Sequence, residues 1–74
     1  MTRLTDLRRE RNLSTNKLAI LARVASSTVK KIEEGTPVYA DSVFKVARAL
    51  GVDATELKGA RIYRGPYAEV EEII

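Results

Sequence analysis

The chain of 74 residues contains no cysteine, histidine or tryptophan. The absence of Cys and His excludes disulfides, thiolate nucleophiles and the usual zinc ligand sets, and it removes the commonest general base. The longest apolar run, Leu18 to Ala22, is far shorter than the roughly 20 residues of a membrane span, and Arg3 leads into Asp6 rather than into a signal-peptide core. So small a domain also leaves little room for an active-site cleft. We therefore expect one cytoplasmic domain that is not an enzyme and binds no metal or cofactor.

Charge is distributed unevenly along the chain. Residues 1–31 carry eight basic and two acidic side chains, residues 32–64 carry five of each, and residues 65–74 carry three acidic side chains and no basic one. A basic first half suggests a polyanionic partner. A solvated charged surface without any ligand fits the same composition equally well.

Helical periodicity runs through most of the sequence, and strand signals are nearly absent. Helices are predicted at about residues 2–11, 14–22, 26–34 and 40–50, with Ser14 as an N-cap and stop signals at Asn12, Gly35 and Gly51. A capping-box pattern at residues 53–56 opens a short fifth helix through residue 58. The expected inward side chains are Leu4, Leu7, Leu13, Leu18, Ala19, Ala22, Val29, Ile32, Ala40, Val43, Val46, Ala47 and Leu50.

The end of the chain is less regular. Ala60 to Arg64 fits a short extended segment, and Pro66 fits the first position of a final helical turn or two that would place Tyr67, Val70 and Ile74 on one side. The sequence thus predicts an all-α, five-helix domain at residues 1–58 and a C-terminal tail at residues 59–74.

Residues 14–34 form the pattern of two short helices joined by a three- or four-residue turn, which is a helix-turn-helix. At about 100° per residue, Val29 and Ile32 point inward, while Ser27, Lys30 and Lys31 point outward. An α-helix fits the major groove of B-DNA, where Lys donates to guanine O6 and N7 and Ser contacts several bases. These outward side chains alone fit equally a helix face that is exposed to solvent and binds nothing, so this alternative stays open.

A longer motif supports the DNA-binding interpretation. Its elements are Ser14, Leu18-Ala19, Val24, Ser27-Thr28-Val29, Ile32-Glu33 and Gly35, followed by Ala47-x-Ala49-Leu50-Gly51-Val52 and Glu56-Leu57. In this ungapped spacing, residues 4–57 resemble the lambda-repressor-like (Cro and phage-repressor, XRE-type) helix-turn-helix family. The resemblance implies a five-helix domain of a bacterial or phage regulator, which binds a pseudo-palindromic operator in double-stranded DNA as a homodimer.

The resemblance also implies site residues. The positions that resemble base-contacting ones are Ala25, Ser26, Ser27 and Lys31, with Lys30 beside them. Those that resemble phosphate-contacting ones are Ser14, Thr15 and Asn16, at a helix N-terminus where free N–H groups favour phosphate. Electrostatics adds Arg8 and Lys17 as further candidate phosphate contacts, although for these two an exposed charge without a contact is an equal alternative. Arg23, in the turn between the two helices, is a further candidate phosphate contact.

Three positions depart from the family pattern. Thr15 replaces a common Gln that reaches both phosphate and the recognition helix. Arg23 stands where Gly is common, and a left-handed turn there costs Arg roughly 1 kcal/mol. Ala25 holds the cap position of the recognition helix but cannot cap it, so Ser26 either caps the helix one residue later and drops out of base reading or stays available as a base contact.

Several apolar side chains have no obvious cover in the predicted fold. They are Ile20 on the outer side of the second helix and, in the tail, Ile62, Tyr63, Tyr67, Val70, Ile73 and Ile74. We expect the tail to pack either on its own domain or on a second subunit or protein partner.

The sequence thus favours a sequence-specific DNA-binding transcription regulator of the Cro or repressor type. Two alternatives remain open: an antitoxin-like or adaptor module that uses the same fold to bind a protein, and the DNA-binding part of a longer repressor.

Overall fold

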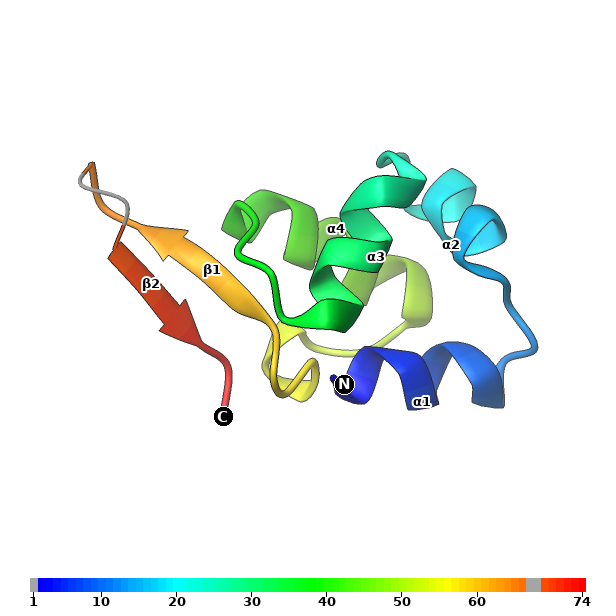
Figure 1. The fold of residues 1–74 in the computed structure, drawn as a ribbon. Coiled ribbons are helices and arrows are strands. Elements are labelled where there is room, and N and C mark those ends of the chain that lie inside the picture. The colour runs from blue at the N-terminus through cyan, green and yellow to red at the C-terminus, as the bar shows by residue number, and fades with distance from the viewer. Residues whose placement is uncertain (1, 67–68) are drawn as a thin grey trace.

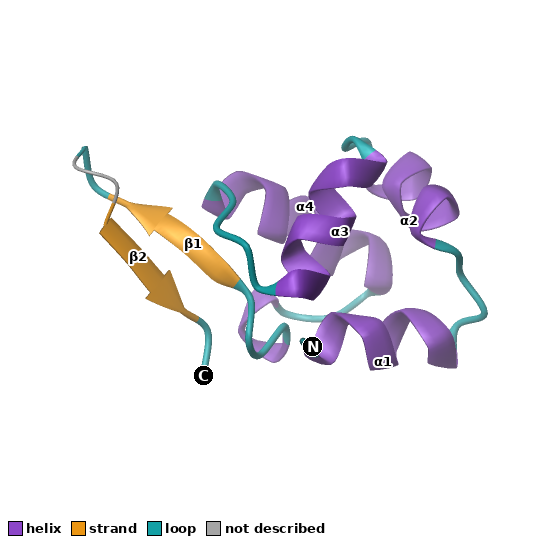
Figure 2. Ribbon diagram, viewed as in Figure 1, coloured by secondary structure: helices purple, strands orange, loops and turns teal. Residues whose placement is uncertain are grey.

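The structure is a computed structural model that describes residues 2–66 and 69–74. Within them the chain forms four α-helices, one 3₁₀ turn and a two-stranded antiparallel sheet (Figures 1 and 2). The elements are α1 (Arg3–Glu10), α2 (Thr15–Ala22), α3 (Ser26–Glu34), α4 (Ala40–Leu50), η1 (Ala54–Glu56), β1 (Arg61–Arg64) and β2 (Glu69–Glu72). The helices form one cluster, and the strands project from one end of it as a hairpin.

All four helices end in the same way. A residue in the left-handed region follows each helix, with φ of 53° at Asn12, 60° at Arg23, 77° at Gly35 and 74° at Gly51. After each helix two successive N–H groups bond back to carbonyls of its last turn, as in a Schellman motif. The predicted stop signals are therefore confirmed.

The hydrophobic core lies between the helices and extends to the base of the hairpin. The expected inward side chains are buried, apart from Leu13 and Ala40, which are half-buried; Val38, Leu57 and Ala60 complete the core. Leu4, Leu18, Val29, Ile32 and Val46 are fully enclosed. Ile20 is 72% exposed, as its place on α2 predicted.

The expectation of an all-α, five-helix fold is wrong. The capping box at Asp53 and Glu56 forms, but the helix that it opens is a single 3₁₀ turn. Leu57 leaves helical geometry at φ −82° and ψ 59°, and its side chain is fully buried, so the chain turns into the core instead of continuing a helix.

The final helix predicted after Pro66 is also wrong, because residues 69–72 form β2. The extended segment predicted at residues 60–64 is confirmed as β1. Ion pairs join Arg61 to Glu72 at 3.4 Å and Arg64 to Glu71 at 2.6 Å across the strands. These pairs belong to the antiparallel register and would not form in a short C-terminal helix.

The base of the hairpin is bonded to the helical domain. Val38, in the loop before α4, donates its N–H to the Arg61 carbonyl and accepts from the Tyr63 N–H, both at 3.0 Å. Ile62 and Ile73 pack against the core. The base of the hairpin therefore attaches to its own domain, while the far ends of β1 and β2 stand away from it (Figure 1).

No helix in the described ranges is long and apolar enough to cross a membrane.

Candidate nucleic-acid interface

The turn between α2 and α3 fixes how the two helices cross. Arg23 adopts φ 60° and ψ 44°, and its N–H and that of Val24 bond to the carbonyls of Ile20 and Ala19 at 3.2 and 3.0 Å. Val24 is half-buried against the core. The left-handed geometry considered for Arg23 is therefore present, and the chain tolerates a non-glycine residue there.

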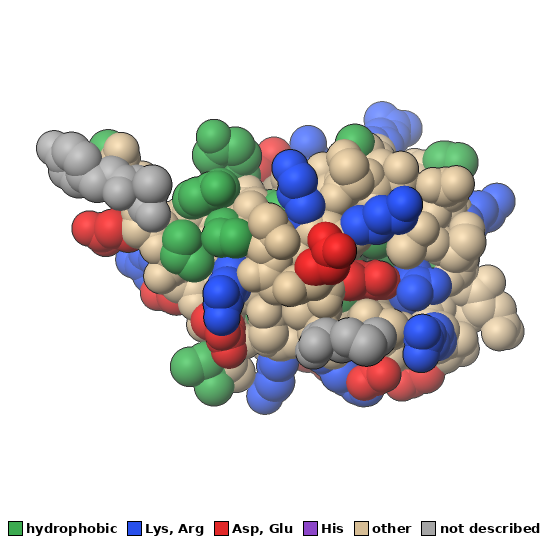
Figure 3. Space-filling view, viewed as in Figure 1, with side chains coloured by type: hydrophobic (Ala, Val, Ile, Leu, Met, Phe, Trp, Pro, Cys, Tyr) green, Lys and Arg blue, Asp and Glu red, His purple; other side chains and the backbone are tan. Residues whose placement is uncertain are grey.

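The inner side of α3 is anchored and its outer side is free. Val29 and Ile32 have no exposed surface. The outer side carries what we call the reading face: Ala25, Ser26, Ser27, Lys30 and Lys31. All are exposed except the half-buried Ser26, and neither lysine has an ion pair with any described residue. Lys and Arg side chains project from the face that α3 presents in Figure 3.

The capping role considered for Ser26 is wrong. Ala25 occupies the N-cap position with extended backbone angles, φ −70° and ψ 147°, and makes no side-chain cap; Ser26 is already the first helical residue. The Ala25 carbonyl accepts from the N–H of Thr28 at 2.9 Å, so the helix starts without a capping hydroxyl. The Ser26 hydroxyl is therefore not used as an N-cap.

The start of α2 is capped as predicted. The Ser14 hydroxyl accepts a hydrogen bond from the Lys17 N–H at 3.0 Å. Thr15 is half-buried, while Asn16 and Lys17 are exposed. Ser14 thus has a structural role, and the exposed first turn of α2 keeps the partial positive charge that favours an anion.

Arg8 is used inside the domain. Its Nε donates to Glu33 Oε1 at 2.6 Å and its Nη1 donates to the Leu13 carbonyl at 2.8 Å, and only 14% of its side chain is exposed. The pair joins α1 to α3. We therefore omit Arg8 from the proposed phosphate contacts.

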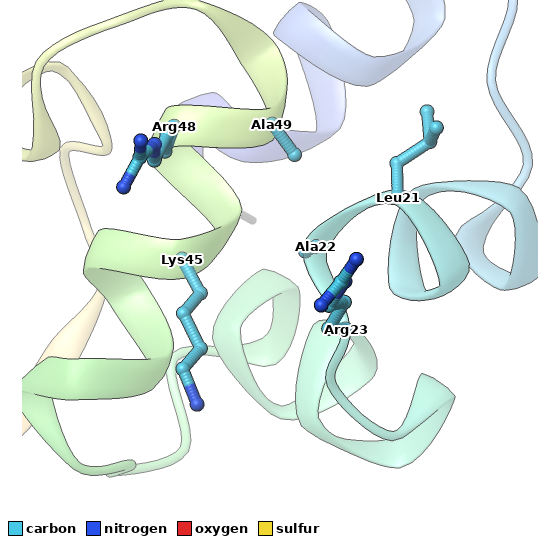
Figure 4. Close-up of a pocket in the computed structure, with 6 residues that line it drawn as sticks. All are labelled: Leu21, Ala22, Arg23, Lys45, Arg48 and Ala49. Atoms are coloured by element: carbon cyan, nitrogen blue, oxygen red, sulfur yellow. The ribbon is translucent and has the colours of Figure 1, made fainter.

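Sequence reasoning missed two basic residues near Arg23. Lys45 and Arg48 of α4 line a shallow groove together with Leu21, Ala22, Arg23 and Ala49 (Figure 4). The three cationic side chains point in different directions, with Arg48 directed away from Arg23. Lys45 also pairs with Asp41 at 3.4 Å. The groove therefore does not gather its charges around one small anion.

A second groove runs from the reading face to the hairpin. It is lined by Thr28 and Lys31 of α3, by residues of the loop before α4, and by Tyr63 of β1. Tyr39 and Tyr63 face each other there, with ring centroids 5.4 Å apart and planes inclined at 48°. Tyr39 is 72% exposed and was missed from the sequence, because it lies at the N-cap of α4 and outside any helical period.

The described residues hold no group of three His, Cys, Asp or Glu side chains that is placed to bind a metal ion.

Comparison with known proteins agrees with this geometry. The family model described as a helix-turn-helix domain matches residues 2–59, which run from the residue before α1 to the second residue before β1. No curated protein and no solved structure matches the chain. The match covers most of the sequence and includes both crossing helices, so the chain belongs to the helix-turn-helix domain family.

Proposed function

We propose that the chain is a sequence-specific, double-stranded DNA-binding transcription regulator of the Cro or repressor type, bacterial or phage-encoded and cytoplasmic. The observation that carries the proposal is the reading face, because two serines and two lysines without an ion pair to any described residue lie on a helix whose other side is fixed in the core. Such a helix enters the major groove with its N-terminal residues at the base edges.

In this proposal the two helices have different tasks. The reading face contacts bases, with Lys31 and Lys30 as donors to guanine. The first turn of α2 contacts phosphate through Thr15, Asn16 and Lys17, and Arg23 adds a charge at the turn. Ser14 supports this contact by holding the helix start.

The proposed partner is a pseudo-palindromic operator bound by two copies of the chain. Selection of bound duplexes from a random library tests this directly. We expect two related half-sites about 10 base pairs apart, centre to centre. A dimer that neutralises about six phosphates loses affinity by about a thousandfold between 50 and 200 mM salt.

A variant pair tests the reading face. Lys31→Ala is expected to weaken binding to the selected duplex by about 1–3 kcal/mol and to relax preference at one base position. Lys58→Ala removes the same charge from the exposed segment after η1 and is the matched control. Equal effects of the two variants, with unchanged preference, would contradict the assignment of Lys31.

The alternative of a protein-binding module makes the opposite prediction. It expects weak affinity for any duplex, without a steep salt dependence, and tight association with a protein through residues 59–74. Gel-shift titration at two salt concentrations separates the two functions.

A further inference from the structure

The groove between α2 and α4 combines apolar walls with positive charge. Its lining residues come from the end of α2, the turn after it and the second half of α4; they are Leu21, Ala22, Arg23, Lys45, Arg48 and Ala49 (Figure 4). None of these six residues is acidic, and none belongs to the reading face. The groove has a volume of about 550 Å³. We call it the α2–α4 groove; α4 lies behind α3 in the view of Figure 1.

Exposed apolar side chains flank the positive charge. Leu21 lines the groove on the α2 side and is 52% exposed. Phe44 is 62% exposed and lies one turn before Arg48 on the same side of α4. Phosphates of DNA would pair with the cations but would leave this apolar surface uncovered. Aromatic residues and Arg are instead enriched where one protein contacts another.

The two cations of α4 are available to a partner. Arg48 makes no ion pair with any described residue. Lys45 pairs with Asp41 at 3.4 Å, but the two side chains are 51% and 79% exposed. Such a surface pair adds little stability, so Lys45 can exchange Asp41 for another carboxylate at low cost. Arg23 is also a candidate phosphate contact, and we therefore rely on Lys45 and Arg48.

The spacing of these cations indicates what kind of anion fits them. Lys45 and Arg48 are three residues apart, which separates their Cα atoms by about 4.5 Å along the axis of α4. Carboxylates three or four residues apart on another helix lie on one side of it at a similar spacing. A helix that presents carboxylates on successive turns therefore matches cations that point in different directions, as a single small anion does not.

We propose that the α2–α4 groove binds an acidic amphipathic helix of a protein partner. The helix lays its apolar side against Leu21 and Phe44 and places its carboxylates at Lys45 and Arg48, which is the helix-in-groove mode of recognition. The contact does not depend on the proposed DNA-binding function, because the groove lies outside the reading face. In a chain that binds DNA as proposed, the groove holds the partner protein beside the operator.

Selection from a displayed library of random peptides tests the chemistry of the partner. The peptides have about 15 residues, long enough to form a helix on binding, and the target is the full native chain. We expect the enriched peptides to carry Asp or Glu at spacings of three or four residues, with large apolar residues on the same side. Enrichment of peptides without acidic residues, or no enrichment at all, would overturn the proposal.

Titration of the tightest-binding acidic peptide with variants, followed by fluorescence anisotropy, locates the site. Arg48→Glu is expected to raise the peptide dissociation constant by about tenfold or more, whereas Lys30→Glu reverses the same charge on the reading face and should change it little. Leu21→Ser is expected to raise it by about tenfold. Ile20→Ser is the matched control, since Ile20 is also exposed on α2 but does not line the groove. Circular dichroism of each variant confirms the fold.

An exchange of charges separates direct contact from damage to the fold. The peptide with its acidic residues replaced by Lys is expected to bind Arg48→Glu more tightly than it binds the native chain. If it shows no such preference, or if Arg48→Glu and Lys30→Glu weaken binding of the acidic peptide equally, the peptide does not occupy the groove and the proposal is wrong.

Duplex binding by the same variants distinguishes a protein partner from DNA. Arg48→Glu is expected to affect duplex affinity no more than Lys58→Glu, which reverses a charge on the exposed segment after η1. A much larger loss for Arg48→Glu, in a chain that enriches no acidic peptide, would overturn the inference and assign the groove to DNA. Acidic peptides that bind the groove of a chain without affinity for any duplex would support the inference and contradict the proposed function.

Discussion

Arg23 is the residue at which a single substitution is expected to stabilise the protein. It lies at φ 60° in the same helix-ending motif in which Gly35 and Gly51 occupy the equivalent positions. A residue with a Cβ destabilises the folded state by about 1–2 kcal/mol in this conformation, because the Cβ approaches the following carbonyl oxygen. The guanidinium makes no hydrogen bond or ion pair with any described residue that would offset the strain.

Arg23→Gly removes this strain but increases the conformational freedom of the unfolded chain, which lowers stability by about 0.5–1 kcal/mol. The net gain is about 0.5–1 kcal/mol, which in a domain of this size raises the Tm by about 2–8 °C. Thermal unfolding followed by circular dichroism measures the shift. Arg23→Ala is the matched control, because it removes the same charge and keeps the strained backbone.

Gly51→Ala tests the same reasoning with the opposite sign. An added Cβ at Gly51 has no atom within 4 Å, so its φ of 74° is the only source of strain. We expect Gly51→Ala to lower the free energy of unfolding by about 1 kcal/mol. If Arg23→Gly and Arg23→Ala unfold at the same temperature, the strain argument is refuted. If Arg23 of each copy contacts one phosphate, both Arg23 variants reduce the salt slope of DNA binding by about 0.9 per bound copy, which is about 1.8 for the two copies proposed on the operator, whatever their stability.

Three further predictions concern the framework around the interface. Arg8→Ala removes the cation from a half-buried ion pair and leaves its carboxylate partner without compensation, so urea denaturation should show a free energy of unfolding lower by about 1–3 kcal/mol. Arg9→Ala, at an exposed position, should change the free energy of unfolding little. Gly59→Ala places a Cβ 3.3 Å from the N-terminal segment at φ 93° and should lower the Tm by more than Gly51→Ala does. Hydrogen bonds from the Thr55 N–H and hydroxyl lower the pKa of Asp53, so the stability that Asp53 adds is present above its ordinary pKa and is lost as the pH falls through the lowered value. The Tm difference between the native chain and Asp53→Ala should therefore shrink in acid, and a constant difference would contradict this origin.

The helices were predictable because their signals are local. The stop signals at Asn12, Gly35 and Gly51, the Ser14 cap and the inward periodicity each depend on residues within one or two turns. The helix-turn-helix and the exposure of Lys30 and Lys31 follow from the same signals. Most of the candidate interface was therefore visible in the sequence.

The rest depends on partners that are distant in the sequence. Glu33 pairs with Arg8 across 25 positions, and Val38 bonds to the strand that contains Ile62. No periodicity marks such partners, so Arg8 was expected at phosphate and the segment after Pro66 was expected as a final helical turn or two. Two predicted surface residues, Ile62 and Ile73, pack on the core for the same reason. Tyr67, also predicted for that surface, lies outside the described residues.

The two sides of α3 separate folding from recognition. Val29 and Ile32 anchor the helix in the core, while Ser27, Lys30 and Lys31 contact no other part of the domain through an ion pair or side-chain hydrogen bond within the described residues. Substitutions on the outer side are therefore expected to be nearly neutral for stability. Under the proposed function, related chains can therefore acquire new operators by changing a few exposed positions. The same separation makes α3 a cassette: its outer residues can be exchanged for those of another regulator without redesigning the core.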